Sequence, residues 1–289
     1  MATLATPITQ VKTRGSAAGL DWGATLGKLA VRSPAGGLSF HLLPTRDVDA
    51  GRRALAEAGA QRIGLTGGGA AAVAKGLAGD SMQVNEFAAW GAGAAALLAE
   101  QELPPSRRYL LVSLGTGTSV LLVDGLAVTR IGGTALGGGT LVGLAAGLFG
   151  TGDFGCIAEL ARSGSRREVD LLVSDIYRAG GIALAGDLTA ANFGKLAPRL
   201  AAGERIPDAD LAHALMGLVG ENVALVCAGL AASAQVTRIV FGGSTLRENP
   251  VLAEVVGGIT RALGREAVFL PRGEFTGALG ALLLAAGEA

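Results

Sequence analysis

The sequence predicts an α/β protein built from two lobes, and three observations support this. Segments with the composition of strands and of helices alternate along the 289 residues. A strand, a glycine-rich turn and a returning strand occur twice, at residues 19–31 and 111–123, which is a weak internal duplication. A proline pair, Pro104-Pro105, separates the two halves. The duplication favours two lobes that face each other with a nucleotide between them.

The first half is expected to hold two hairpin strands, two further strands and three helices. The strand that starts at Leu20 bends at Gly23, where glycine permits a tight turn, and returns to Val31. Periodic apolar residues predict the helices, and short apolar runs between turn residues predict the strands. The remaining elements are strands at 40–43 and 62–66 and helices at 49–58, 70–77 and 88–101.

The second half repeats the hairpin, and Asp124-Gly125 forms the next turn. Asp208 or Asp210 is expected to cap a long helix through its carboxylate. Asn249-Pro250 has the order of an N-cap followed by a first helical residue. The expected ranges are strands at 109–114, 120–123, 238–241 and 267–270, and helices at 141–149, 170–176, 211–233 and 277–286.

These elements suggest three regions. Residues 1–18 mix Thr, Lys, Arg and Gly without an apolar centre, and we expect a flexible extension there. Residues 19–105 form the expected N-terminal lobe and residues 106–289 the expected C-terminal lobe, with the boundary at the proline pair.

The composition excludes several classes of function. A formal net charge of +0 and an aromatic fraction of 4% provide neither a basic stripe nor a stacking platform for nucleic acid. The hydrophobic fraction is 50%, but Glu221 and Asn222 interrupt the most apolar stretch, which argues against a membrane span. Cys156 and Cys227 fit neither a disulfide framework nor a metal-ligand spacing, and they suit a cytoplasmic location.

Glycine marks the candidate ligand contacts. Glycine accounts for 47 of the 289 residues, which is about 16%, whereas it makes up about 7% of average proteins. Most clusters lie where a strand ends or a helix begins. Backbone N–H groups at such places can approach phosphate oxygens closely, because glycine has no Cβ.

The first glycine turn lies between Asp21 and Lys28. Thr25 offers a hydroxyl and Lys28 a positive charge to phosphate oxygens. Asp21 offers a carboxylate to Mg²⁺, which prefers oxygen ligands. Leu29 follows Lys28, so the segment is not a Walker A loop. An ordinary glycine hairpin with a surface lysine is the alternative interpretation.

Three further segments lie in the second half. Residues 115–119 repeat the hairpin pattern, and the glycines at 137–139 before a helix predict an anion site. Arg130 is a candidate for stabilising charge on a transferring phosphoryl group, with a solvated surface arginine as the alternative. Ser244 follows two glycines at a strand end, which suits either an adenine or ribose contact or a simple turn.

Glu86 is an isolated acid among apolar and small residues. In a cleft its carboxyl would have a raised pKa and act as a general base toward a hydroxyl. An acid that interacts with a helix dipole is the alternative. Residues 67–72 also fit the Gly-x-Gly-x-x-Ala pattern, with Glu86 about twenty residues further on, which adds a Rossmann-type dehydrogenase as a minor alternative.

Together these motifs resemble the phosphate loops of the actin-like ATPase and sugar kinase superfamily, and more narrowly the type II pantothenate kinases. The resemblance runs from about residue 19 to residue 286. Its most specific strings are Gly-Asp-Leu-Thr-Ala-Ala-Asn-Phe-Gly at 186–194 and the Arg-Ile-Gly-Gly…Gly-Gly-Gly stretch at 130–139. The other matching segments are residues 65–68, 86–87, 115–119, 175–177 and 273–280.

The resemblance implies a two-lobed actin-like ATPase fold, which is ribonuclease H-like, with a nucleotide cleft between the lobes. It implies that a homodimer transfers phosphate from ATP, with Mg²⁺ bound at Asp21, to the terminal hydroxyl of pantothenate in coenzyme A biosynthesis. Glu86 aligns with the catalytic base and Arg130 with an arginine that contacts pantothenate; Thr116, Thr189 and Ala190 complete the implied substrate positions. The implied nucleotide positions are Asp21, Trp22, Gly23, Ala24, Thr25, Leu26, Gly27, Lys28, Thr116, Gly138, Gly139, Thr140, Leu141, Val142, Phe154 and Ser244.

Three residues depart from the family pattern. Ala24 stands where the family usually has glycine, Trp22 is bulkier than usual, and Phe154 lacks the hydroxyl of the tyrosine found in some members. Two other functions remain open: a non-catalytic nucleotide-binding regulator of the same fold, and a kinase for another small hydroxyl substrate. The pairing of Glu86 with Arg130 favours a kinase, because a regulator needs no substrate base.

Overall fold

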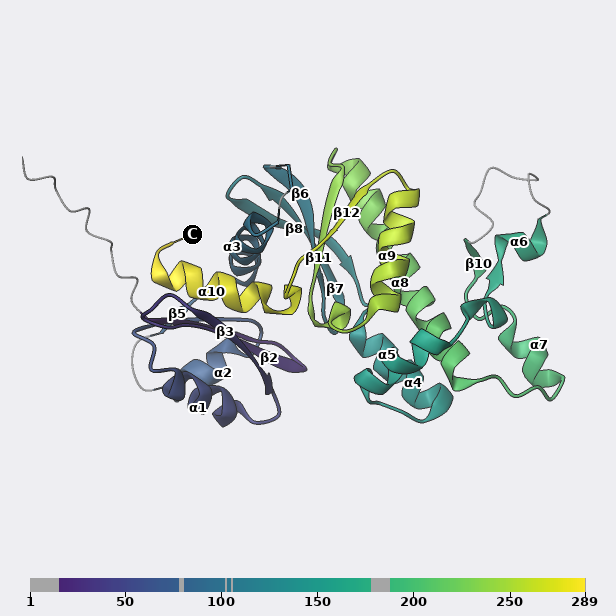
Figure 1. Cartoon of the computed structure of the whole chain (residues 1–289), viewed down its shortest axis with the longest axis horizontal. Helices are drawn as coiled ribbons and strands as arrows, with labels where there is room; N and C mark the ends of the chain where they lie inside the picture. The colour runs from purple at the N-terminus through teal and green to yellow at the C-terminus, as the bar shows by residue number, and fades with distance from the viewer. Residues whose placement is uncertain (1–15, 78–80, 102, 105, 178–187, 289) are drawn as a thin grey trace, which may run out of the picture. The chain divides into compact units, whose positions relative to one another are not determined.

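The computed structural model describes residues 16–77, 81–101, 103–104, 106–177 and 188–288 (Figure 1). Their contacts divide the chain into two units: unit 1 is Met1–Gly93 with Gly277–Ala289, and unit 2 is Ala94–Thr276. This division differs from the predicted lobes in two places: unit 2 begins at Ala94, before the proline pair, and the segment that starts at Gly277 belongs to unit 1. Each unit contains one five-stranded sheet.

The sheet of unit 1 has the strand order β3-β2-β1-β4-β5. The first three strands form an antiparallel meander, while β4 pairs in parallel with β1 and β5 in parallel with β4. Ala17 and Ala18, expected in the N-terminal extension, are fully buried in β1 and belong to the sheet. The bounds are β1 (Ala17–Trp22), β2 (Leu26–Arg32), β3 (Leu38–Pro44), β4 (Arg62–Thr66) and β5 (Met82–Gln83).

Side chains of β1 alternate between two packed faces. Leu20 and Trp22 point into a core formed with α1 (Val48–Ala58) and α2 (Ala70–Ala74). Ala17 lies in a second core with residues of α10 (Thr276–Ala286). A Cβ on Gly19 would clash with the backbone of α10, so this strand and helix are in direct contact.

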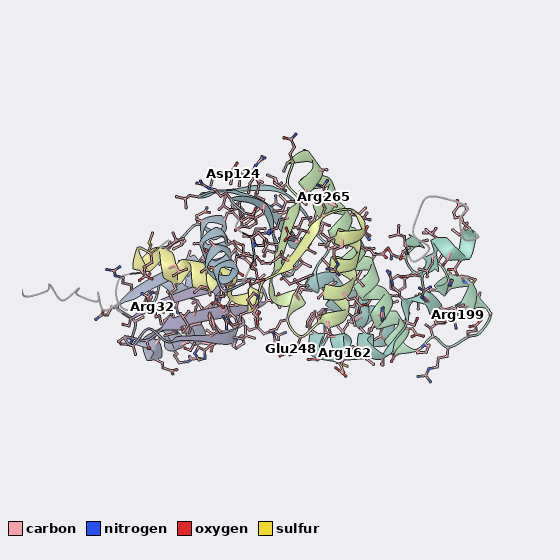
Figure 2. All side chains as sticks on the ribbon, turned by 45° about the horizontal axis from the view of Figure 1, so that its top comes forward. Arg32, Asp124, Arg162, Arg199, Glu248 and Arg265 are labelled. Carbon is pink, nitrogen blue, oxygen red and sulfur yellow. The ribbon has the colours of Figure 1, made fainter. Side chains whose placement is uncertain are left out.

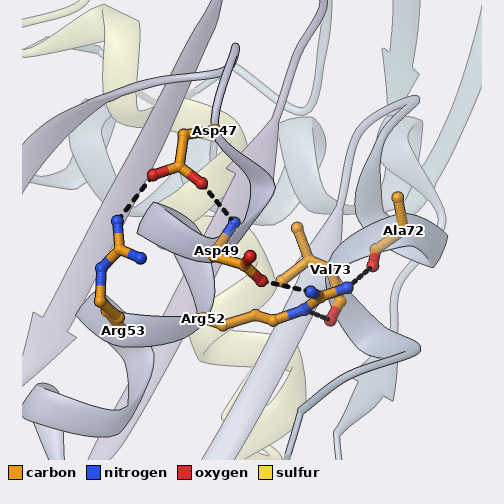
Figure 3. A network of polar contacts seen from close by, with 6 residues as sticks. All are labelled: Asp47, Asp49, Arg52, Arg53, Ala72 and Val73. Carbon is orange, nitrogen blue, oxygen red and sulfur yellow. Dashed lines mark hydrogen bonds and ion pairs between the residues drawn. The ribbon is translucent and has the colours of Figure 1, made fainter.

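One arginine ties α1 to α2 (Figure 3). The Arg52 guanidinium donates hydrogen bonds to the carbonyl oxygens of Ala72 (2.6 Å) and Val73 (3.1 Å) and pairs with Asp49 one turn earlier. Asp47 caps α1 by accepting a hydrogen bond from the Asp49 N–H (3.0 Å). Carbonyl groups in the last turn of a helix lack partners within it, and the arginine supplies donors to two of those in α2.

The sheet of unit 2 repeats the topology of the first. Its strand order is β12-β11-β6-β7-β8, in which β6, β7 and β8 form an antiparallel meander and β11 and β12 add in parallel. The internal duplication expected from the two hairpins is therefore confirmed. The bounds are β6 (Arg108–Leu114), β7 (Thr118–Asp124), β8 (Ala127–Thr134), β11 (Arg238–Gly242) and β12 (Glu266–Phe269).

Four helices cover the core of unit 2: α4 (Gly138–Phe149), α5 (Phe154–Ser163), α8 (Asp208–Ser233) and α9 (Pro250–Ala262). By length and composition α8 could cross a membrane, but 67% of its most apolar stretch is buried inside the protein. Glu221, in the middle of α8, forms a buried ion pair with Arg166. These features are those of a core helix.

The expected caps of the two long helices had different outcomes. Asn249 caps α9, and its side-chain oxygen accepts a hydrogen bond from the Leu252 N–H (3.2 Å), as predicted. The prediction for α8 was wrong, because Pro207 is the N-cap residue. The Asp210 carboxylate instead accepts a hydrogen bond from the Ser165 N–H (2.7 Å), which ties α8 to the loop after α5.

Smaller elements complete the described chain. The helix expected at 170–176 was partly wrong, since this stretch contains β9 (Leu171–Leu172) followed by the short α6 (Val173–Ile176). Arg199, labelled in Figure 2, lies on the surface and pairs with Glu204 at 2.7 Å. The other elements are α3 (Glu86–Ala99), β10 (Thr189–Ala191), α7 (Leu196–Ala201), η1 (Arg166–Glu168), η2 (Ser244–Leu246) and η3 (Gly273–Phe275).

Candidate functional site

A carboxylate and an ammonium group face each other across the first hairpin. Asp21 and Lys28 occupy paired positions on β1 and β2, and their Oδ2 and Nζ atoms are 3.7 Å apart. Only 5% of Asp21 is exposed. Burial raises the pKa of Asp21, and the positive charge of Lys28 partly offsets this rise. A buried carboxylate is stabilised in its charged form by a nearby positive charge.

Glycine makes the space that the Asp21 carboxylate occupies. A Cβ on Gly67 would lie 2.5 Å from Oδ1, and a Cβ on Gly277 would lie 2.9 Å from Oδ2. Gly67 also has a φ of +87°, which side chains with a Cβ rarely adopt. The glycines that also matched a dinucleotide-binding pattern therefore have a different role in this fold, at the end of β4.

The bulky Trp22 points away from the hairpin turn. Only 3% of it is exposed, and it belongs to the core under α1 and α2. A Cβ on Gly27 or Gly51 would lie 2.7 Å from its ring, and one on Gly69 would also clash with the indole. The three glycines accommodate the tryptophan, so its size does not narrow the turn. Because the Trp22 side chain is in the core, the predicted nucleotide contact of this residue would have to be made by its backbone.

The turn itself presents small groups to solvent. Ala24 and Thr25 are exposed at its tip, and Leu26 begins the returning strand. A Cβ on Gly23 would lie 3.2 Å from the Lys28 Nζ atom, so the ammonium group reaches back to the turn. Of the predicted nucleotide positions in the first hairpin, Ala24 and Thr25 are exposed and Gly23, Leu26 and Lys28 are half-buried, while the other three are buried.

Glu86 is the first residue of α3 and is exposed. The Asn85 side-chain oxygen accepts hydrogen bonds from the N–H groups of Phe87 (3.0 Å) and Ala88 (3.1 Å) and so caps this helix. Shielding by surrounding protein raises the pKa of Glu86, and the nearby charge of Asp21 raises it further, while Lys28 lowers it. The structure thus brings Glu86, Asp21 and Lys28 into one electrostatic group.

The second hairpin is bound to the start of α4 through its backbone. The N–H groups of Gly138 and Gly139 donate to the carbonyl oxygens of Gly115 and Thr116, both at 2.9 Å. The Thr245 hydroxyl also donates to the Gly115 oxygen, at 2.8 Å. Two amides expected to face an anion are therefore used inside the protein. The anion-binding role of this segment stays a prediction.

Other predicted nucleotide positions around α4 differ in accessibility. The Thr140 hydroxyl donates to the Ala135 oxygen (3.2 Å), and Leu141 is fully buried in the core. Val142 and Phe154 are partly buried against the same core. Ser244 begins η2 directly after β11 and is half-buried.

Four of the predicted substrate positions lie in unit 2, three of them on strands. Arg130 lies on β8 next to a bulge in its pairing with β7, and its side chain is exposed. The sequence analysis assigned no strand to this segment, so β8 was missed. Thr116 is exposed in the second hairpin turn. Thr189 and Ala190 lie on β10, and the first two residues of their motif, Gly186 and Asp187, are outside the described residues.

Sequence reasoning missed a group of buried charges beside β10. Arg166 donates a hydrogen bond to the Thr189 hydroxyl (3.2 Å) and pairs with Glu221 of α8. Asp170 is fully buried, and its carboxylate accepts a hydrogen bond from the Phe193 N–H (2.8 Å). Burial raises the pKa of Asp170. The one signal in the sequence was an acid in the middle of an apolar helix.

Asp21 is the buried carboxylate beside the first hairpin turn, and its role in holding Mg²⁺ stays a prediction. Among the described residues, no three His, Cys, Asp or Glu side chains form a metal cluster. Mg²⁺ commonly keeps several waters and binds one or two carboxylates together with substrate phosphates. A single buried carboxylate beside an exposed glycine turn fits that pattern.

Comparisons with known proteins agree with this geometry. The model of the Fumble family matches residues 94–284. A type II pantothenate kinase of Staphylococcus haemolyticus is 34% identical over 92% of this chain and 98% of its own length. Component A of the (R)-2-hydroxyglutaryl-CoA dehydratase of Acidaminococcus fermentans has a TM-score of 0.63 at 18% identity, over 94% of this chain and 98% of its own.

A glucokinase of the ROK family from Streptomyces griseus, solved with glucose and AMPPNP, has a TM-score of 0.59 at 16% identity. It is matched over 94% of this chain and 100% of its own length. At such identities the two solved structures show the fold alone, and they confirm the predicted actin-like ATPase fold. The sequence match over nearly the whole chain goes further, and the chain belongs to the type II pantothenate kinase family.

Proposed function

We propose that this protein phosphorylates pantothenate with ATP to give 4′-phosphopantothenate, the first step of coenzyme A biosynthesis. Its membership of the family supports this activity. The single observation that carries the chemistry is the grouping of Glu86 with Asp21 and Lys28 at one end of the sheet of unit 1. An acid with a raised pKa is suited to accept a proton near neutral pH.

Glu86 is the general base in this proposal. Its carboxylate takes the proton from the terminal hydroxyl of pantothenate, whose oxygen then bonds to the γ-phosphorus of ATP as the bond to the leaving ADP oxygen breaks. Phosphoryl transfer depends mainly on positioning and on stabilisation of charge, and less on covalent chemistry by the protein. Arg130 provides positive charge for the transferring group from its exposed position on β8.

The first hairpin binds the phosphates of ATP. Lys28 provides a point charge, Thr25 a hydroxyl, and the small residues of the turn allow close approach of the backbone. Mg²⁺, when bound, offsets negative charge on the phosphate oxygens, and Asp21 is the residue that would hold it, directly or through water. The second hairpin, in which Thr116 is exposed at the turn, supplies the other phosphate contacts.

A homodimer in the cytoplasm is part of the proposal. Exposed apolar side chains on α4 and α8 support self-association, because unpartnered leucines on neighbouring helices favour an interface. They are Leu144 (40% exposed) and Leu148 (41%) on α4 and Leu225 (52%) on α8. Both cysteines are free thiols, as is usual in a reducing compartment.

A coupled assay of ADP release with Mg²⁺-ATP tests the function. We expect ADP release to depend on pantothenate and to be lost in Glu86→Gln. Glu57→Gln, in an exposed acid on α1, is the matched control and should leave the rate unchanged. Intact ATP binding without stimulation by pantothenate would contradict the substrate and favour another hydroxyl acceptor. Stimulation by no acceptor would favour a nucleotide-binding regulator.

A further inference from the structure

A buried hydrogen bond joins the end of β4 to the chain just before α3. Thr66 is the last residue of β4, and 1% of it is exposed. Its hydroxyl donates to the carbonyl oxygen of Val84 (3.0 Å). The Val84 N–H in turn donates to the carbonyl oxygen of Leu65 (2.8 Å). Both backbone groups of Val84 are therefore held by β4.

This anchor lies close to Glu86 along the chain. Asn85 alone separates Val84 from Glu86, and its side chain is already used as the cap of α3. A fixed Val84 and a capped helix start leave Glu86 little freedom in its backbone. The position of Val84 therefore fixes the backbone position from which the Glu86 side chain extends.

The same threonine is adjacent to the acid of the first hairpin. Thr66 on β4 is the Cα partner of Asp21 on β1 in the parallel pairing. One side chain therefore connects the strand beside Asp21 with the segment that carries Glu86. All of these residues belong to unit 1.

We propose that Thr66 is a positioning residue, whose hydroxyl holds Glu86 at a fixed place relative to Asp21 and Lys28. The inference rests on the proposed role of Glu86 as the base. Thr66 is buried and acts through Val84 and Asn85. A general base must lie within hydrogen-bonding reach of its proton, so a small displacement of the carboxyl slows the transfer.

Two substitutions separate the hydroxyl from the shape of the side chain. Thr66→Val keeps the branched shape and removes the donor, while Thr66→Ser keeps the donor. Thr260→Val is the matched control, because Thr260 is a buried threonine of α9 whose hydroxyl makes no hydrogen bond among the described residues. Thermal unfolding of each variant reports whether it is folded.

Kinetics give the first readout. We expect Thr66→Val to lower kcat by about ten- to a hundredfold, as a misplaced catalytic group does, with the KM for ATP unchanged. Thr66→Ser should recover most of kcat, and Thr260→Val should behave as the wild type. A folded Thr66→Val variant with wild-type kcat, or a Thr66→Ser variant as slow as the valine variant, would overturn the proposal.

The second readout does not need turnover. Burial, and after it the charge of Asp21, raises the pKa of Glu86, so a Glu86 released from its position should titrate at lower pH. Carbon-13 NMR of labelled glutamate, with the Glu86 signal assigned from Glu86→Gln, measures this in the apo protein. An unchanged Glu86 pKa in Thr66→Val overturns the positioning role, whatever the activity. A wild type without pantothenate-dependent turnover contradicts the proposed function alone.

Discussion

The hairpins β1–β2 and β6–β7 hold the same place in two sheets of the same topology, yet they differ in chemistry. In the next-to-last strand pair the first hairpin has Asp21 opposite Lys28, and the second has Ser113 opposite Ser119. The first carries a buried ion pair, while the second is bound by its backbone to the start of α4. Hydrogen-bonded pairing and apolar burial repeat in both hairpins, whereas a pair of opposite charges at this position is present only in the first.

The largest expected effect concerns stability, and it comes from Trp22, which lies opposite Gly27 in the last residue pair of β1 and β2. Trp22→Ala should lower the free energy of unfolding by about 3–5 kcal/mol, because three glycines cannot close around the cavity that the indole leaves. Leu126→Ala, in a side chain that is 98% exposed, is the control and should change it by less than about 0.5 kcal/mol. Urea denaturation measures both. A Trp22 variant as stable as the Leu126 variant would show that the tryptophan is not a core residue.

A second test compares the charged pair with its neutral counterpart. Lys28→Met should reduce kcat/KM for ATP by about 10²–10³-fold, since it removes a positive charge aimed at phosphate oxygens. Ser119→Ala should have a much smaller effect, because that position carries no charge. Steady-state kinetics on both variants decide the matter. Equal losses would mean that the two hairpins contribute alike and that the comparison is wrong.

The stability of the second hairpin is expected to fall when a larger side chain is introduced at the start of α4. A Cβ on Gly137 would lie 2.7 Å from the Gly117 Cα and 2.8 Å from the Gly115 oxygen, so Gly137→Ala should cost about 1–3 kcal/mol. Gly143→Ala in the same helix has open space and should instead stabilise the protein by about 0.4–1 kcal/mol. Thermal and urea unfolding check the contrast. Similar stability changes in the two variants would exclude tight packing of α4 on the hairpin.

The smallest expected effect is on how kcat and the free energy of unfolding depend on pH. The pKa of Glu86 is raised above its ordinary 4.5, so kcat should fall on the acidic side as Glu86 is protonated at this raised pKa. The folded protein then holds that proton more tightly than the unfolded chain, and stability falls as the pH rises between the ordinary and the raised pKa. Glu86→Gln should remove this loss, which denaturation at pH 5 and pH 7.5 would detect. If the stability of the wild type and of Glu86→Gln changed with pH in the same way, the raised pKa of Glu86 would be contradicted.

Most of the elements followed from local patterns. Both hairpins, the strand at 62–66 and the Asn249-Pro250 helix start were predicted because short-range turn and capping chemistry specifies them. The strand β8 was missed, since Gly132 and Gly133 resemble a loop. There a Cβ on Gly132 would lie 2.6 Å from a methyl group of Leu230 of α8, so this glycine faces a core helix.

The site divides in the same way. The residue types of Asp21, Lys28 and Glu86 indicated a base and a phosphate contact. The structure pairs Asp21 with Lys28, and the charges of both act on the pKa of Glu86. Whether Arg130 and Ser244 act with them stays a prediction. The acid in the middle of α8 was visible in the sequence, but its pairing with Arg166 could not be predicted, because the two residues are far apart in the sequence and meet only in the fold.

The sequence by itself determined the alternation of strands and helices, the duplication, and the kinds of chemical group available, since each depends on residues close along the chain. The tertiary structure decided what the glycines are for. Those around Trp22 make room for a side chain from another strand, and Gly138 and Gly139 bind a hairpin through their N–H groups. Such roles depend on which atoms approach from distant segments, and spacing along the chain carries no information about that approach.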